Sequence, residues 1–283
     1  MKSMVTTLAI IACVIFLIIG NLYWKEKTQI TSNVESSNAA SSEDKDKTAD
    51  KSAEVDEDEQ SDEVAEDELD IAAIMDKAAN WPNDARNALK TTAEDGEKFL
   101  LAIVGSQSLG GDGGWAMMLK DELEEEYPGI IDVQLFEYEG ATSQEFVDSE
   151  YIEEVVAATP DLVLLEPFPL NDNSGWISVE ANQTNIETFV DALNEARAED
   201  DQDVIVMLQP AHPIYNATVY PQQISQLKEY ADSEGFVYLD HWSVWPDHAS
   251  EEILDYLGDG QSTPSEAGHE IWFEYLLEYF VKK

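Results

Sequence analysis

Short apolar runs and amphipathic segments alternate along the chain from residue 98 onward. Runs of four to eight apolar residues are typical of buried strands, and apolar positions three and four apart are typical of helices. The predicted strands are 99–104, 130–136, 161–165, 203–208 and 236–239, and the predicted helices between and after them are 115–126, 143–158, 179–198, 221–233 and 264–280. An earlier segment, 71–94, is also predicted to be helical, with a turn at 80–83.

Strands that are apolar throughout and separated by helices indicate a parallel sheet covered on both faces. The pattern therefore predicts an α/β fold of three layers, α/β/α, with a flavodoxin-like parallel sheet of about five strands. Sites in such sheets lie at the carboxyl ends of the strands. The loops at that edge contain Ser106 and Ser108, Gly140, Asn171, His212, and Asp240 with His241.

The first 27 residues have a different pattern. No charge occurs from Ser3 to Trp24, and 22 uncharged residues make a helix of about 33 Å, enough to cross the roughly 30 Å hydrocarbon core of a bilayer. No small-residue cleavage site follows the run, so a cleaved signal peptide is disfavoured. We predict an uncleaved single-pass transmembrane anchor at 1–27 in the cell membrane, with the rest of the chain outside the cytoplasm. Lipid modification of Cys13 is the alternative.

Residues 28–70 contain almost no large apolar side chains and many acids, so they are predicted to be a disordered linker. Residues 71–283 are long enough for one well-buried domain. That domain holds 43 acidic and 9 basic residues, a net charge of −34, so the acidity is not confined to the linker. Such a surface repels nucleic acid, which excludes it as a partner, and predicts adaptation to a salty, halophilic environment.

The loop after the first strand reads Gly105-Ser-Gln-Ser-Leu-Gly-Gly-Asp-Gly-Gly-Trp115. A serine just past a strand and ahead of a helix exposes its hydroxyl near backbone N–H donors, as nucleophilic catalysis requires. A phosphate site is disfavoured because the loop has no basic residue and matches neither the P-loop nor the dinucleotide pattern. The four histidines have no metal-ligand spacing, so we expect no metal and no cofactor.

These blocks resemble the SGNH/GDSL hydrolase family. Its first block reads Gly-Asp-Ser-Leu, and the best match places Ser108 at the nucleophilic serine, with Ser106 and Gln107 where the family has Gly-Asp. The resemblance extends from residue 99 to the C terminus. It implies that Gly140, after the second strand, and Asn171, after the third, donate to the oxyanion. Pro169 replaces the family glycine of the third block, and the connection after Leu165 is longer.

The last family block, Asp-x-x-His, is incomplete. Asp259 matches its aspartate, but Ser262 or Thr263 stands in place of the histidine, and neither accepts a proton near neutral pH. His241 follows the fifth strand at the predicted site edge, so topology favours it as a substitute base, with Asp259 as a supporting acid. The competing interpretation is that His241 packs beneath Trp242 and Trp245.

Two functions are consistent with this pattern. The first is a membrane-anchored SGNH-type serine esterase or carbohydrate O-deacetylase, with acylated cell-surface carbohydrate or a small ester as substrate. The second is a catalytically impaired SGNH-like domain that binds cell-surface glycans or assists cell-envelope assembly. Retention of Ser108, Gly140 and Asn171 favours the hydrolase, and the missing histidine favours the binding domain. Fold resemblance does not decide between them.

Overall fold

A computed structural model describes residues 70–198 and 203–283. The core of this part is a parallel sheet of five strands in the order β2-β1-β3-β4-β5. The strands are β1 (Phe99–Gly105), β2 (Ile131–Glu137), β3 (Leu162–Leu165), β4 (Ile205–Leu208) and β5 (Val237–Tyr238). β1 pairs with both β2 and β3, so it lies inside the sheet and its carboxyl end meets theirs. The predicted three-layer α/β/α architecture with about five parallel strands is confirmed.

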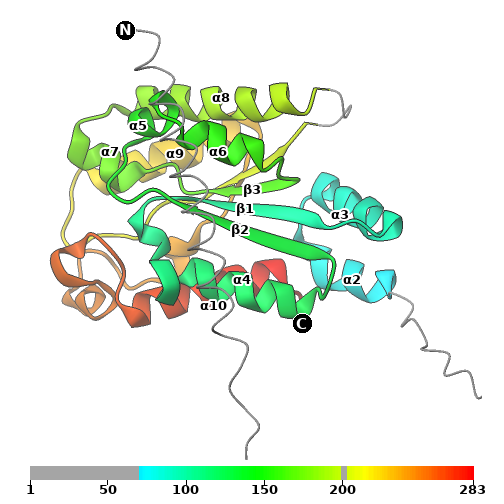
Figure 1. Ribbon diagram of the computed structural model, residues 1–283. Coiled ribbons are helices and arrows are strands. Elements are labelled where there is room, and N and C mark those ends of the chain that lie inside the picture. The colour runs from blue at the N-terminus through cyan, green and yellow to red at the C-terminus, as the bar shows by residue number, and fades with distance from the viewer. Residues whose placement is uncertain (1–69, 199–202) are drawn as a thin grey trace, which may run out of the picture. The chain divides into compact units, whose positions relative to one another are not determined.

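Helices cover both faces of the sheet (Figure 1). One face is covered by α4 (Trp115–Glu126) and α10 (Glu266–Phe280), and α2 (Ile71–Lys77) and α3 (Asn83–Asp95) pack into the same core. The other face is covered by α5 (Ser143–Asp148), α6 (Tyr151–Ala157), α8 (Val179–Ala196) and α9 (Tyr220–Glu234). α7 (Pro169–Gly175) follows β3 and contacts α9 and α5.

The alternation of side chains along β1 explains why its sequence is apolar throughout. Leu101 and Ile103 are buried in the core beneath α4 and α10, whereas Ala102 and Val104 are buried in the core beneath α5 and α8. Successive residues of a strand point to opposite faces, so a strand covered on both sides needs apolar residues at every position.

Local structure departs from the predictions at three places. The helix predicted at 143–158 is two helices, because Ser149 adopts an extended conformation between α5 and α6. α7 was not predicted: Pro169 occupies its first turn, and the segment is too short to show helical periodicity. α10 begins at Glu266 rather than at Pro264, which forms an isolated bridge with Leu257.

The predicted anchor (1–27) and the linker (28–70), apart from its last residue, lie outside the part of the chain that the structure describes. Among the helices that it does describe, none combines the length and hydropathy needed to cross a bilayer. Both predictions therefore remain predictions.

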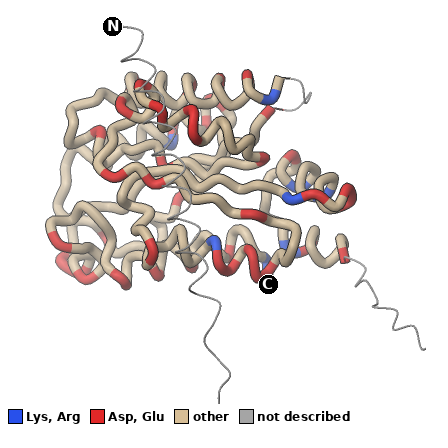
Figure 2. The backbone as a smooth tube through the Cα atoms, viewed as in Figure 1, with Lys and Arg blue, Asp and Glu red and all other residues tan. Residues whose placement is uncertain are grey.

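Acidic residues are distributed over the helices and loops of the domain, and Lys and Arg are few (Figure 2). Several of the basic residues form ion pairs that are at least partly solvent-exposed, such as Lys77 with Glu126 and Lys228 with Asp240, at 2.7 and 2.8 Å. Exposed pairs of this kind contribute at most about 1 kcal/mol each. They do little to offset the repulsion among the excess acids.

Candidate functional site

Two loops and the short helix α7 meet around the side chain of Gln107 at the carboxyl edge of the sheet. Its Oε1 atom accepts hydrogen bonds from the backbone N–H of Gly140 and from Nδ2 of Asn171, both at 3.0 Å. Its Nε2 atom donates to Oδ1 of Asn171 at 2.8 Å. The two donors that the family resemblance assigns to the oxyanion therefore converge on one oxygen atom.

Backbone geometry and neighbouring loops hold these two donors in place. Gly140 has a φ of +75°, a left-handed conformation that favours glycine, and it directs its N–H toward Gln107. Nδ2 of Asn171 also donates to the carbonyl of Ala141 at 2.7 Å, which ties α7 to the loop after β2. Both donors are thus fixed before any ligand binds, as electrostatic stabilisation of an oxyanion requires.

The buried carboxylate of Asp172 fixes α7 to α5 and α8. It accepts from the N–H and the hydroxyl of Ser143, at 2.8 and 2.6 Å, and from Nδ2 of Asn182 at 2.8 Å. Burial raises the pKa of Asp172, and these hydrogen bonds oppose the rise. Because α5, α7 and α8 all contribute to this network, the neighbouring Asn171 is held rigidly.

The two serines of the loop lie inside the protein. Ser106 and Ser108 are both fully buried, and Oγ of Ser106 accepts from the N–H of Ser108 at 3.3 Å. The hydroxyl oxygen of Ser108 has no hydrogen-bond partner among the described residues. Its carbonyl accepts from Nε1 of Trp115 at 2.9 Å, so the backbone of the loop is fixed even though the hydroxyl is not engaged.

Glu166, at the end of β3, lies directly beside the first serine. Its Oε2 atom accepts from the N–H of Ser106 at 2.7 Å, and its Oε1 atom is buried without a partner in the described part of the chain. Complete burial raises the pKa of Glu166 to about 8, although hydrogen bonds from Ser106 lower it. The carboxyl group is therefore largely protonated and uncharged at neutral pH.

His241 is a core residue. Its Nε2 donates to the carbonyl of Pro210 at 2.9 Å, and its Nδ1 accepts from Nε1 of Trp245 at 3.0 Å. Its ring stacks on Trp272 with centroids 3.9 Å apart, and burial lowers its pKa to about 3. Neither ring nitrogen is free to take a proton from a serine, so this geometry does not support the prediction of His241 as the base.

Two other histidines contact segments that the family resemblance covers. His269, on α10, fills the space beside Gly110, where a Cβ atom would lie 2.3 Å from its ring, and its Nδ1 accepts from the N–H of Trp115. His212, in the loop after β4, donates from Nε2 to the carbonyl of Gln261 at 3.2 Å. That bond leaves the lone pair on Nδ1 of His212, which is buried and has no partner among the described residues. Burial lowers the pKa of each to about 4.

The segment that resembles the last family block reaches the sheet edge through Gln261 rather than Asp259. Asp259 is solvent-exposed, and no hydrogen bond or ion pair involving it occurs within the described ranges. Gln261 accepts from His212 through its carbonyl and from the N–H of Tyr215 through its side chain at 2.7 Å. The predicted pairing of Asp259 with a histidine is not formed in this structure.

The structure therefore brings together Gly140 and Asn171 of the predicted site, with Ser108 one residue from the side chain that they bind. Sequence reasoning missed Gln107 and Glu166, and it placed His212 at the site edge but ranked His241 above it. The position of Glu166 directly after β3 at the site edge could have indicated it. A family match shifted by one residue, with Gly105-Ser106-Gln107 at Gly-Asp-Ser, could have indicated Gln107, although not its hydrogen bonds to the oxyanion donors.

No group of three or more His, Cys, Asp or Glu side chains able to hold a metal ion occurs in the described part of the chain. The N–H donors of Gly140 and Asn171 can hold one acceptor oxygen, and in this structure that oxygen is Oε1 of Gln107.

The family model for the GDSL-like lipase/acylhydrolase family matches residues 100–271, which includes every loop of the site. No curated protein matches the chain. Among solved structures, an alpha/beta hydrolase enzyme from the metagenome of Lake Arreo, Spain, is 13% identical with a TM-score of 0.51, over 64% of this chain and 94% of its own.

A carbohydrate esterase family 3 protein from Talaromyces cellulolyticus is 14% identical, with a TM-score of 0.50, over 64% of this chain and 95% of its own. At such identities these structures show a shared fold. The family model covers more than half of the chain. Membership of a lipase/acylhydrolase family supports ester hydrolysis as the class of activity. The chain belongs to the GDSL-like lipase/acylhydrolase family.

Proposed function

We propose that the chain is an ester hydrolase whose substrate carbonyl is held by the N–H of Gly140 and Nδ2 of Asn171. The observation that carries this proposal is the convergence of both donors on Oε1 of Gln107. That oxygen belongs to an amide carbonyl, the same type of group as the ester carbonyl of a substrate. At rest Gln107 occupies the carbonyl site, so its side chain has to rotate away before a substrate binds.

Ser108 is the proposed nucleophile. In the reaction its Oγ would form a bond to the carbonyl carbon as its proton passes to a base. The base would then return that proton to the ester oxygen as the C–O bond breaks, so that the alcohol leaves and the acyl-enzyme forms. Water would then attack the acyl-enzyme and release the acid. The donors of Gly140 and Asn171 would stabilise the negative charge that develops on the carbonyl oxygen in both steps.

We propose His212 instead of His241 as the base. His212 is neutral at pH 7 because burial lowers its pKa, and the carbonyl of Gln261 fixes its tautomer so that Nδ1 carries the lone pair. A backbone carbonyl in this role orients the ring as a carboxylate does in other hydrolases. His212 also follows β4 at the edge that carries the oxyanion donors.

One observation favours the second candidate function, a domain that binds acylated glycans without hydrolysing them. Shifting the match by one residue aligns Gly105-Ser106-Gln107 with the family's Gly-Asp-Ser and puts Gln107 at the nucleophile. Gln107 is the residue whose side chain reaches the oxyanion donors. A neutral amide is not a nucleophile for acyl transfer, so under this match the site would only bind.

A fluorophosphonate probe tests the two candidates on the full-length chain in high salt. The hydrolase predicts covalent labelling that maps to Ser108, is lost in Ser108→Ala and persists in the control Ser106→Ala. If neither the folded wild type nor folded Gln107→Ala is labelled, the hydrolase proposal is overturned and the glycan-binding function is the one that remains. Labelling of Ser106 instead would move the nucleophile by two residues.

The finer parts of the proposal concern location and substrate. We propose that residues 1–27 anchor the chain in the cell membrane with the domain outside the cytoplasm, and that acylated cell-surface carbohydrate is the substrate. The uncharged run from Ser3 to Trp24 supports the anchor. Protease treatment of intact cells tests the location: the domain should be cleaved from outside, and full protection would contradict this topology.

A further inference from the structure

An open groove lies where α7 ends and α9 begins. Its volume is about 570 Å³, and its lining includes Asn173, Trp176, Ser178, Ile214, Thr218 and Val219. α7 connects it to the carbonyl site, because the same short helix carries Asn171 and Asn173. The proposed mechanism uses none of the groove residues.

Trp176 is the most unusual of them. Its side chain is 94% exposed, although tryptophan is the largest side chain and is ordinarily well buried. Its backbone has a φ of +60°, a left-handed conformation that glycine usually provides at the end of a helix. A tryptophan that is exposed and has a strained backbone contributes little to the stability of the fold. Strained backbone conformations of this kind cluster at ligand sites.

The groove is also free of charge. None of the residues that line it is acidic or basic, although 27% of the residues of the chain are charged and its net charge is −45. Two other cavities in the described part are lined by several acids, including Asp84 with Glu234 in one and Glu139 with Glu145 in the other. A groove without acids on so acidic a protein fits an uncharged ligand.

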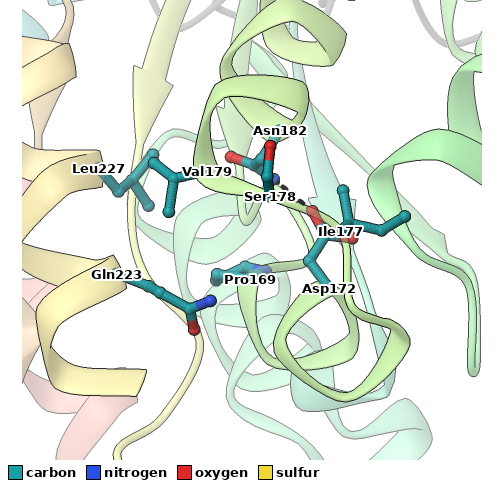
Figure 3. A pocket seen from close by; sticks show the side chains of 8 residues that line it. All are labelled: Pro169, Asp172, Ile177, Ser178, Val179, Asn182, Gln223 and Leu227. Atoms are coloured by element: carbon teal, nitrogen blue, oxygen red, sulfur yellow. Dashed lines mark hydrogen bonds between the residues drawn. The ribbon is translucent and has the colours of Figure 1, made fainter. Parts of the chain in front are cut away.

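The polar groups of the groove are amides and hydroxyls. Asn173, Ser178, Thr218 and Gln223 contribute such groups beside the apolar side chains of Ile214 and Val219. Figure 3 shows Gln223 extending from α9 toward Pro169 of α7 in the adjoining small cavity, which shares Ser178 and Ile177 with the groove. The Oε1 atom of Gln223 has no hydrogen-bond partner within the described residues.

An exposed indole ring next to amide and hydroxyl groups is suited to a sugar ring, which has an apolar face and a rim of hydroxyls. We propose that this groove binds a neutral saccharide, with one sugar ring stacked on Trp176 and its hydroxyls bonded to the groove amides. The net charge of the protein opposes an anionic polysaccharide, an anionic membrane surface or a second copy of the chain in the same groove.

The saccharide would be the alcohol part of the ester, so the inference rests on the proposed function and assigns the groove in which the saccharide of its substrate would lie. Binding is measured separately from hydrolysis by using saccharides without acyl groups. The probes are a neutral N-acetylglucosamine oligomer, a neutral glucose oligomer and a galacturonic acid oligomer of equal length, titrated calorimetrically into the full-length chain at high salt.

We expect at least one neutral oligomer to bind and the acidic oligomer not to bind. Trp176→Ala should weaken binding at least tenfold, Trp176→Phe should retain most of it, and the control Leu254→Ala, which truncates another exposed apolar residue, should not change it. Failure of both neutral oligomers to bind, or equal affinity in Trp176→Ala, would overturn the proposal.

Fluorophosphonate labelling of the same variants separates this inference from the proposed function. Labelling should be unchanged in Trp176→Ala if the groove binds only the sugar. If saccharide binding depends on Trp176 but the probe never labels the chain, the saccharide-binding proposal is supported and the hydrolase proposal is refuted.

Discussion

Replacing Glu166 by glutamine should change how the stability of the protein depends on pH. The folded pKa of Glu166 is about 8, against a value of about 4.5 for an ordinary glutamate. Between those values the folded chain retains a proton that the unfolded chain has released. The stability that this proton contributes is fully present below pH 4.5 and is lost as pH rises toward 8.

The magnitude follows from the size of the shift. Each pKa unit corresponds to about 1.4 kcal/mol, so a group titrating near pH 8 when folded would lower the free energy of unfolding by about 5 kcal/mol between pH 4.5 and 8. Glutamine is isosteric, does not titrate and can still accept from the N–H of Ser106 through its Oε1. Glu166→Gln should therefore lack this slope.

Urea unfolding of both proteins from pH 5 to 9 at constant high salt measures the effect. The difference between the two free energies of unfolding removes the titration of all other groups, including His212 and His241, whose lowered pKa values act in the opposite direction. Relative to the wild type, the free energy of unfolding of the variant should rise by about 1.4 kcal/mol per pH unit up to pH 8 and stay constant above it. A constant difference across the range would refute the assignment of a buried, protonated Glu166.

Three further predictions concern the fold. His241→Phe keeps the stacking on Trp272 but leaves the carbonyl of Pro210 and the indole N–H of Trp245 without hydrogen-bond partners. The free energy of unfolding in urea should therefore fall by about 2–4 kcal/mol, and activity per folded molecule should not change. Loss of activity in a folded variant would restore His241 as the base. Gly140→Ala should cost about 1 kcal/mol because of its positive φ, whereas the control Gly113→Ala should be nearly neutral; equal costs would contradict the backbone argument. Raising KCl from 0.1 to 2 M should raise the melting temperature by roughly 2–4 °C for each kcal/mol of repulsion that is screened among the excess acidic residues of the domain; an unchanged melting temperature would argue against salt adaptation.

The sequence predicted the sheet and most helices because the apolar runs are continuous in the strands and periodic in the helices. β1 shows this well, since Leu101 and Ala102 belong to cores on opposite faces and both had to be apolar. The break at Ser149 and the short helix α7 were not predictable from periodicity. Each depends on a local conformation that tertiary contacts impose, as those of Asp172 with Ser143 and Asn182 do.

The site was predicted in part. The positions of Gly140 and Asn171 at strand ends placed them at one edge, and the structure brings them together. Gln107 was missed because the match that places Ser108 at the nucleophile passes over it, and the hydrogen bonds of its side chain to Gly140 and Asn171 have no sequence pattern. His241 was ranked by its place after β5, but burial and the indole of Trp245 decide what its ring nitrogens do.

The claim that Gly140 and Asn171 form a carbonyl site that Gln107 occupies at rest is tested most directly by ester hydrolysis in four proteins. They are the wild type, Gln107→Ala, Asn171→Ala and the double variant, each assayed as the full-length chain for kcat/KM with p-nitrophenyl acetate. Opening the site should make Gln107→Ala more active than the wild type. Loss of an oxyanion donor should lower activity by about 10²–10³-fold in both backgrounds. Inactivity of both the wild type and Gln107→Ala, or full activity of Asn171→Ala, would contradict the claim.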